Sequence, residues 1–420
     1  MLTDRGRWIL AFGGGVYLAA WGFGSEALYP IALGLVLAVA AAALWVRFLS
    51  RPLALNRSVT GGEHFAGDDI PVRLEVDVDG RIPSGALVVR ERIARLGERE
   101  TVMVNRRGRL RGSYRLQQVP RGRYPVESVD ALLEDPFGLE RVEIRLPAGE
   151  SLLVYPRLVE LEGLFSDSGA RALEGRRLLL RRPTGFDLHS VRDYQQGESL
   201  RRVHWPSTAK RGHLMVKELE DAPRDETAVL LDADATAVAG VPPDTSFELQ
   251  VRAAGSILKA HARRGRRAAL IINSATRPYQ RVHSFDGEWL RALELLAAVE
   301  PDGPTPVAAL LADEAGPAGR ALELTVVTAS LTARLVDRLL QRMQSRHSAT
   351  LVYVEPASFA GEAGPLDPAT GALVLRLQRG GVPVAVLRRG DDLAEKLGAD
   401  ELSGARLAGG NGRAEEAALA

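Results

Sequence analysis

The chain has 420 residues and a formal net charge of +1, so it offers no overall basic field that would attract nucleic acid. Its apolar fraction of 46% is ordinary for a globular protein and too high for a disordered one. The sequence contains no Cys, which excludes disulfides, thiolate metal sites, iron–sulfur clusters and a cysteine nucleophile.

Two apolar runs at the start of the chain predict a pair of membrane-spanning helices. The first is uncharged over Trp8–Gly24, and the second covers Ala27–Val46. Both lengths fit a bilayer, which a helix crosses in roughly 17–25 residues. A cleaved signal peptide is the alternative, but the second apolar run follows directly and no small-residue cleavage site precedes a soluble start. We therefore expect residues 1–50 to form a transmembrane helical hairpin.

The charges beside these runs predict the orientation of the hairpin. Arg5 and Arg7 precede the first run, Arg47 and Arg51 follow the second, and Glu26 is the charge in the turn between them. Positively charged flanks favour the cytoplasmic side of a membrane. The sequence thus places the protein in the inner or plasma membrane, in contact with lipid, with its soluble domains in the cytoplasm.

Residues 51–156 carry the period-two pattern of β-strands. Apolar and polar side chains alternate over Ile70–Val78, and similar short runs follow with Gly, Pro and Asp between them. The stretch Glu134–Val142 indicates a turn between two strands, because Gly138 permits a positive φ. These features predict a β-sandwich-like domain. The arginines of Asn105–Tyr124 fit a solvated strand face better than a lipid-binding surface.

Residues 157–226 are expected to form a linker that carries a motif, and residues 227–403 an α/β domain. The buried run Thr227–Ala237 is strand-like, and a helical pattern follows over Phe247–Gly265. Strands and helices then alternate, which predicts a doubly wound, mostly parallel sheet that binds ligands at the carboxyl ends of its strands. The Ala/Gly/Glu-rich residues 404–420 are predicted to form a disordered tail.

Oxygen-bearing side chains gather where the first strand of the α/β domain ends. Asp232, Asp234 and Thr236 alternate, so in an extended chain they point the same way and suit a hard divalent cation. This D-x-D-x-T pattern resembles the first metal-binding loop of von Willebrand factor A domains. The stretch Asp302–Leu311 resembles the second loop of that family and supplies Thr305.

The third loop departs from the family pattern, because Ala329 follows Thr328 where the family has an acid. The resemblance therefore implies a von Willebrand A-like fold with a weak, degenerate site for Mg²⁺ or Mn²⁺. The alternative is that these residues only cap strands and turns.

A longer motif precedes the α/β domain. It consists of Arg192, Tyr194, Gly197, Glu198, Arg201, Val203, Trp205 and Ala209. Together with "RGRY" at Arg121–Tyr124 and "DPFGL" at Asp135–Leu139, this motif resembles the bacterial membrane proteins of the domain-of-unknown-function family numbered fifty-eight. The resemblance covers nearly the whole chain and implies the same order of hairpin, β domain, motif and von Willebrand A-like domain.

The resemblance implies partners rather than a reaction. Members of the family look like partners of MoxR-type AAA+ ATPases, often beside transglutaminase-like membrane proteins. Arginine forks pair with carboxylates and aromatic side chains are frequent hot spots, so the motif can form a partner surface. The residues assigned to this surface are Arg192, Tyr194, Glu198, Arg201, Trp205 and Arg211.

Two other interpretations of the motif compete with a partner surface. In the first, Tyr194 and Trp205 pack on the α/β domain and the arginines pair with neighbouring acids. The second is nucleic-acid binding, which the acidic run Glu218–Glu226 and the near-zero net charge disfavour, so we expect no nucleic-acid partner.

These observations together predict a membrane-anchored cytoplasmic scaffold or adaptor that is not an enzyme. It would present a von Willebrand A-like domain to a MoxR-type ATPase in assembly, maturation or envelope stress. The alternative is a metal-dependent hydrolase that uses Asp232 and Asp234. Such an enzyme needs a general base near the metal, and the sequence identifies no His or third acid for that role.

Overall fold

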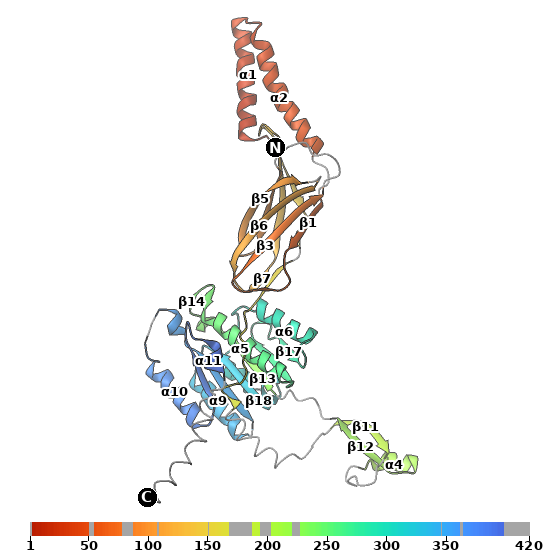
Figure 1. The fold of residues 1–420 in the computed structure, drawn as a ribbon, viewed down its shortest axis with the longest axis vertical. Coiled ribbons are helices and arrows are strands. Elements are labelled where there is room, and N and C mark those ends of the chain that lie inside the picture. Colours follow the sequence, from red (N-terminus) through yellow and green to blue (C-terminus); the bar gives the residue numbers. More distant parts are fainter. Residues whose placement is uncertain are drawn as a thin grey trace, which may run out of the picture. The chain divides into compact units, whose positions relative to one another are not determined.

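The computed structural model describes residues 2–49, 54–77, 87–106, 109–149, 151–167, 187–193, 203–220, 227–345, 347–361 and 364–398. The chain divides into two compact units, Met1–Tyr155 and Pro156–Ala420. The first unit contains the N-terminal helices and a β domain, and the second contains an α/β domain and a small hairpin (Figure 1).

The chain begins with two helices, α1 (Asp4–Phe23) and α2 (Leu28–Leu49), which lie side by side (Figure 1). Thr3 caps the start of α1, and Gly24 ends it in the left-handed region. Among the described helices, α2 alone is long and apolar enough to cross a membrane, over Leu28–Arg47 with a mean hydropathy of 2.2. A membrane-spanning role for α1 stays a prediction.

The β domain consists of two sheets around one hydrophobic core. The larger is antiparallel, in the order β1 (Ala54–Val59), β3 (Asp68–Asp77), β6 (Arg109–Val119), β5 (Gly97–Arg106), β4 (Leu87–Ile93), β8 (Val126–Glu134) and β9 (Arg141–Leu146). The smaller is β2 (His64–Phe65), β10 (Leu152–Tyr155) and β7 (Gly122–Tyr124). The predicted alternation in Ile70–Val78 is confirmed, because Ile70, Val72, Leu74 and Val76 of β3 are buried.

The predicted turn between two strands is also confirmed. It joins β8 to β9, and its Gly138 has φ +68°. The carboxylate of Asp135 accepts hydrogen bonds from the backbone N–H groups of Phe137, Leu139 and Glu140 at 2.6–2.9 Å. This turn also holds the N-terminus, because the Thr3 N–H donates to the Leu139 carbonyl at 3.0 Å.

The α/β domain is built on a six-stranded sheet. Its order is β17 (Tyr279–Val282), β16 (Ala268–Asn273), β13 (Thr227–Asp232), β18 (Glu323–Thr328), β19 (Ser348–Val354) and β20 (Val384–Leu387). All neighbours are parallel except the edge strand β17, so the predicted mostly parallel sheet is confirmed. Every residue of β13 and β16 is buried, as expected for central strands covered on both faces.

Helices cover both faces of this sheet and enclose a separate core on each. One core contains side chains of α5 (Ser246–Arg263), α6 (Gly287–Ala298) and α11 (Leu393–Leu397). The other contains side chains of α7 (Val307–Leu310), α8 (Pro317–Arg320), α9 (Ala333–Gln344) and α10 (Pro368–Arg379). Short elements complete the domain: the 3₁₀ turns η2 (Ala235–Ala237) and η3 (Pro356–Phe359), and the ribbon of β14 (Gly240–Val241) and β15 (Asp244–Thr245).

Residues assigned to the linker by their sequence contribute to this domain. Leu161 and Leu164 are buried in the core beside α5, and the Val159 N–H donates to the Ser256 hydroxyl at 3.0 Å. Residues 168–186 of the predicted linker and the predicted tail 404–420 lie outside the described residues.

Candidate functional site

Three parallel strands bring polar side chains together at the carboxyl edge of the sheet. Asp232 and Asn273 are paired in register at the ends of β13 and β16, and Thr328 ends β18. The Asn273 amide donates to Asp232 Oδ1 at 3.1 Å, and the Thr328 hydroxyl donates to Asp232 Oδ2 at 2.6 Å. Asp232 is 3% exposed, so both of its oxygens are satisfied inside the protein.

The environment of Asp232 favours its neutral form. Burial raises the pKa of this carboxyl above its usual value, and the nearby charge of Asp234 acts in the same direction. The hydrogen bonds from Thr328 and Asn273 oppose that shift, because they stabilise the ionised form.

Asp234 and Thr236 lie in a turn that follows the strand. β13 ends at Asp232, and η2 begins at Ala235. The Asp234 carboxylate accepts hydrogen bonds from the Thr236 N–H at 2.9 Å and from the Thr236 hydroxyl at 2.7 Å. The backbone stays extended as far as Asp234, which forms a parallel bridge with Gly303, and the expected alternation then stops because Asp234 caps the 3₁₀ turn that contains Thr236.

A glycine loop carries Thr305 to the same edge. The Gly303 N–H donates to the Ala233 carbonyl at 2.8 Å, and a Cβ at this position would lie 2.2 Å from the Asn273 carbonyl oxygen. Only glycine permits so close an approach of two backbones. Beyond it, the Thr305 carbonyl accepts from the Asn273 amide at 2.7 Å, so Asn273 links Thr305 to Asp232.

Arg277 adds a cation to this cluster. Its guanidinium donates to the Thr305 hydroxyl at 3.0 Å, and its backbone has φ +47°, which is uncommon for a residue with a side chain. Neither Arg277 nor Asn273 was expected at this site from the sequence. Asn273 has a signal in the sequence, because it is the polar residue that ends the apolar strand following β13. In the sheet it is paired in register with Asp232.

The arrangement fits a divalent cation poorly. Asp232 is surrounded by neutral donors, Asp234 is turned toward Thr236, and a guanidinium lies against Thr305. Within the described residues, no group of three or more His, Cys, Asp or Glu side chains could hold a metal ion. As arranged, the cluster ties three strand ends and the Gly303 loop together.

The motif region forms a second candidate site, a small hairpin with a helix between its strands. β11 (Asp187–Asp193) pairs antiparallel with β12 (Met215–Glu220), and α4 (Trp205–Arg211) lies in the connection. Val203, Met215 and Val216 are buried and form its small apolar centre.

Helix α4 is held at both ends by the hairpin's own groups. His204 caps its start through a hydrogen bond from the Ser207 N–H, and Gly212 ends it with φ +74°. The Thr208 hydroxyl accepts from the Met215 N–H at 3.0 Å, which fixes the helix to β12.

The outer surface of α4 combines an aromatic side chain with two cations. Trp205 is 64% exposed, and no residue of this helix is buried. Lys210 and Arg211 are exposed in its last turn. Of the other predicted partner residues, Arg192 lies in β11, whereas Tyr194, Glu198 and Arg201 lie outside the described residues.

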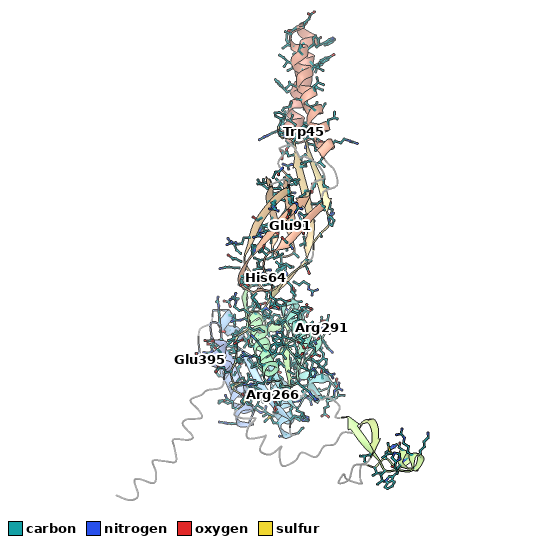
Figure 2. The ribbon with its side chains drawn as sticks, turned by 45° about the vertical axis from the view of Figure 1, so that its right-hand side comes forward. Trp45, His64, Glu91, Arg266, Arg291 and Glu395 are labelled. Atoms are coloured by element: carbon teal, nitrogen blue, oxygen red, sulfur yellow. The ribbon has the colours of Figure 1, made fainter. Side chains whose placement is uncertain are left out.

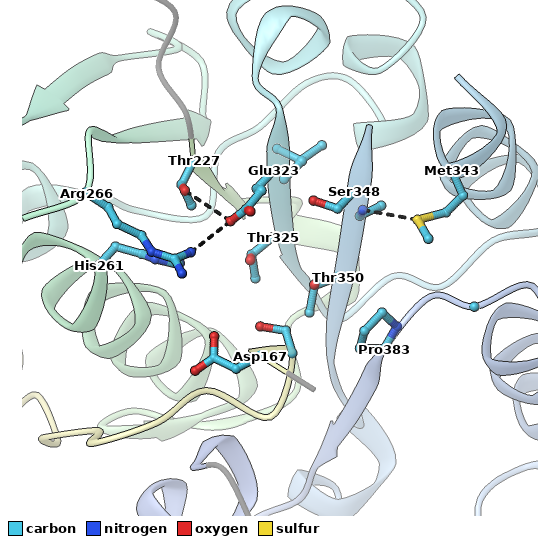
Figure 3. A pocket seen from close by; sticks show the side chains of 14 residues that line it. Asp167, Thr227, His261, Arg266, Glu323, Thr325, Met343, Ser348, Thr350 and Pro383 are labelled. Atoms are coloured by element: carbon cyan, nitrogen blue, oxygen red, sulfur yellow. Dashed lines mark hydrogen bonds and ion pairs between the residues drawn. The ribbon is translucent and has the colours of Figure 1, made fainter. Parts of the chain in front are cut away.

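A small polar cavity lies at the opposite, amino-terminal edge of the sheet (Figure 3). Arg266 and the Thr227 hydroxyl both donate to Glu323 there, at 3.0 and 3.3 Å. His261, which also lines the cavity, is 3% exposed, and its Nδ1 has no hydrogen-bond partner among the residues that the structure describes. The volume of about 40 Å³ accommodates little more than one water molecule, which excludes a substrate site.

Comparison with known proteins gives distant similarities. The chain is 25% identical over 221 residues to "Uncharacterized protein YeaD" of Bacillus subtilis (strain 168), covering 52% of this chain. The chain spans about half the length of that relative, namely 54%.

Two solved structures show only weak likeness. A lipoprotein from Bacteroides thetaiotaomicron is 14% identical, with a TM-score of 0.13, and the match covers 23% of this chain and 80% of that one. Cwp6 from Clostridium difficile is 9% identical, with a TM-score of 0.20, covering 79% of this chain and 45% of that one. Scores this low give no basis for assigning a fold.

A family model gives the most specific match. It covers residues 190–362, which include the β11–α4–β12 hairpin from Ser190 onward and the α/β domain as far as the end of β19 and η3. The family that this part of the chain matches is described as "Protein of unknown function DUF58".

Proposed function

We propose that this protein is a membrane-anchored cytoplasmic scaffold that binds a MoxR-type AAA+ ATPase through the β11–α4–β12 hairpin and an α/β domain of the von Willebrand A type. The observation that carries this proposal is the exposed Trp205, which shares a short helix with Lys210 and Arg211. Binding hot spots between proteins are enriched in large aromatic side chains and in arginine, and this helix exposes both. A transglutaminase-like membrane protein remains a second expected partner.

Two features support the von Willebrand A-like assignment of the α/β domain. Its first strand, β13, is central, and the polar cluster lies at the carboxyl edge, beside the loops that resemble metal-binding loops. In an open α/β sheet, that edge is the usual ligand side.

The membrane anchor is supported by the apolar length of α2 and by the arginines that flank the two helices. Basic flanks on both sides favour a hairpin with both ends in the cytoplasm. The α/β domain would then face cytoplasmic ATPases.

The test is a binding measurement between the full chain in detergent and the purified MoxR-type ATPase of the same organism. Trp205→Ala should weaken binding about 30-fold, which corresponds to about 2 kcal/mol for a hot-spot aromatic. Arg211→Gln should weaken it less and make it less sensitive to salt, because an exposed charge acts mainly on association. Val102→Ala and Arg92→Gln are matched controls, since both residues are exposed on the β domain, outside the proposed binding surface.

The outcome against the proposal is equal affinity of the folded Trp205→Ala variant and the wild type. Absence of any binding by the wild type would remove the ATPase as a partner altogether.

The alternative of a metal-dependent hydrolase receives less support. Asp232 is buried with both oxygens satisfied, and Asp234 caps a turn, so neither carboxylate is free to bind a metal-activated water without rearrangement.

A further inference from the structure

We propose that the first unit binds a single phosphatidylethanolamine headgroup in the cavity between the base of α1 and the β8–β9 turn. This proposal rests on the membrane anchoring proposed above. The cavity has a volume of about 800 Å³ and is lined by polar groups from both elements. Its lining residues include Thr3, Arg5, Arg7, Glu134, Arg141 and Glu143.

The cavity lies where a headgroup would be. Leu139 of the β8–β9 turn packs against Val39 and Ala42 of α2, inside the apolar span that ends at Arg47. Ala42 is five residues before Arg47, which corresponds to about 7.5 Å along a helix. The turn therefore lies within about two helical turns of the end of the apolar span, where the hydrocarbon core would meet the headgroup layer.

An exposed aromatic side chain supports this depth. Phe137, in the same turn, is 77% exposed, although its neighbour Leu139 is buried. A phenyl ring held outward on a rigid turn is stabilised when it enters the apolar boundary of a membrane. Phe137 would thus anchor the turn in the lipid while the cavity faces the headgroups.

The charges in the cavity match a zwitterionic headgroup. It contains three arginines and three carboxylates, with Arg7 paired to Asp4 at 3.1 Å and Arg141 paired to Glu134 at 3.0 Å. Both pairs are exposed and contribute little stability by themselves, so they can open around a ligand. Within the described part of the chain, Arg5 takes part in no hydrogen bond or ion pair, and Glu143 interacts with Arg90 through its charge alone.

These charges are also arranged in the order that the lipid presents. Asp4 on α1 and Arg141 on β9 are the ion-pair partners of Arg7 and Glu134. Of the charges outside these two pairs, Arg5 lies on α1, which continues into the proposed membrane span, whereas Glu143 lies on β9 of the β domain. In phosphatidylethanolamine, the phosphate is attached to the glycerol and the ammonium lies farther from the bilayer. The arginines would therefore bind the phosphate and the carboxylates the primary ammonium.

Lipid retention by the full chain tests this assignment. The chain is purified in detergent with an equimolar mixture of phosphatidylethanolamine, phosphatidylglycerol and phosphatidylcholine, and the bound lipids are counted by native mass spectrometry. We expect the wild type to retain phosphatidylethanolamine at least about threefold over the other two. The excess over phosphatidylcholine is expected because its quaternary ammonium donates no hydrogen bond to a carboxylate.

Two single variants separate the two halves of the headgroup. Arg5→Gln should reduce retention of both phosphatidylethanolamine and phosphatidylglycerol, because both carry the phosphate. Glu143→Gln should reduce retention of phosphatidylethanolamine alone, because only that lipid presents an ammonium donor. Asp337→Asn and Arg376→Gln, which break an exposed ion pair of the α/β domain, should leave all three lipids unchanged.

Three results would overturn the inference. One is equal retention of the three lipids by the wild type, and another is an unchanged lipid profile in both cavity variants. The third is stabilisation by soluble phosphoethanolamine as strong as that by the lipid, which would indicate a soluble ligand. A carbonate wash of membranes separates this failure from that of the anchor, since loss of the wild type from the membrane fraction contradicts the proposed anchoring itself.

Discussion

His261 shows how one buried side chain can make the stability of a domain depend on pH. It lies in α5, and burial, together with the nearby charges of Arg266 and Arg264, lowers its pKa to about 3. An unfolded histidine has a pKa of about 6.5, so between these values the unfolded chain binds more protons than the folded one. The free energy of unfolding of the α/β domain is therefore not reduced by His261 above about pH 6.5, and it decreases progressively as the pH drops from there toward 3.

We predict that His261 alone costs the α/β domain about 2 kcal/mol between pH 7 and pH 5. Hydrogen exchange of the β13 and β18 amides, corrected for intrinsic rates, would measure this loss in the full chain. His261→Leu should remove that part of the pH dependence, whereas the exposed His283→Gln should keep it. An equal acid response of the Leu variant and the wild type would contradict the assignment.

A buried ion pair is the comparable feature of the β domain. Glu91 of β4 is fully buried inside this domain (Figure 2), 3.2 Å from Arg57 Nε, and accepts a hydrogen bond from the Tyr114 hydroxyl at 2.5 Å. Burial and the bond to Glu91 raise the pKa of Tyr114, so its proton stays on the phenol.

Glu91→Gln should destabilise the β domain by about 3–5 kcal/mol, because it leaves the Arg57 guanidinium buried without a counter-charge. Glu100→Gln, which breaks an exposed pair with Arg90, should cost about 0.5 kcal/mol or less. Denaturant unfolding of the full chain in detergent compares the two. Similar losses of unfolding free energy in both variants would show that the buried ion pair contributes no more to stability than the exposed one.

The third prediction at the scale of residues concerns the weak metal site expected from Asp232, Asp234, Thr236 and Thr305. Because the Arg277 guanidinium lies against Thr305, millimolar Mg²⁺ should stabilise the wild type only slightly, by about 0.4 kcal/mol when its concentration equals Kd. Arg277→Gln should enlarge the thermal shift, and Asp232→Asn should abolish it. If Mg²⁺ changes the melting temperature of neither the wild type nor Arg277→Gln, the cluster has a structural role and binds no cation.

At the scale of elements, glycines decide which segments can touch. Gly6 in α1 lies so close to the β8–β9 turn that a Cβ there would be 2.2 Å from the Leu139 carbonyl oxygen. Gly303 similarly lets its loop reach the end of β16. In both places, a close backbone contact joins elements that are far apart in sequence, and no local sequence pattern predicts it.

We predict that Gly6→Ala separates the base of α1 from the turn and costs about 1–3 kcal/mol, as overpacking does. Gly14→Ala is the matched control, because it adds the same methyl group to the same helix where nothing lies within 4 Å. Hydrogen exchange at residues 135–140 should increase in the first variant and not in the second. Unchanged exchange in Gly6→Ala would show that the turn does not depend on α1.

For the whole molecule, the open question is its membrane topology, that is, on which side of the membrane each end of the chain lies. The flanking arginines predict that both ends of the hairpin are cytoplasmic. A fluorescent reporter that matures only in the cytoplasm, fused after Ala420, should therefore be active, and an alkaline phosphatase fusion at the same position should be inactive. The opposite result would contradict the hairpin, because a single crossing by α2 exports one end.

Features that depend on local periodicity could be predicted from the sequence. Alternating polarity over Ile70–Val78 identified β3, and the helical spacing over Phe247–Gly265 identified α5. The turn at Gly138 followed from residue chemistry, as did the oxygen-rich end of β13. Each of these depends on which face of one element is buried, and one segment contains that information.

The contacts between these segments could not be predicted in this way, because they depend on long-range packing. Strand β17 lies at the edge of the sheet and pairs with a neighbour on one side, so polar and apolar residues are mixed in its sequence. Helix α10 begins in a stretch that contains Pro and Gly, and Asp367 caps its start. The sequence placed Asp234 and Thr236 beside Asp232, but the 3₁₀ turn directs them toward each other and Asn273 and Thr328 take their places. Hydrogen bonds between strand ends depend on sheet order and register, which long-range packing sets and local sequence does not.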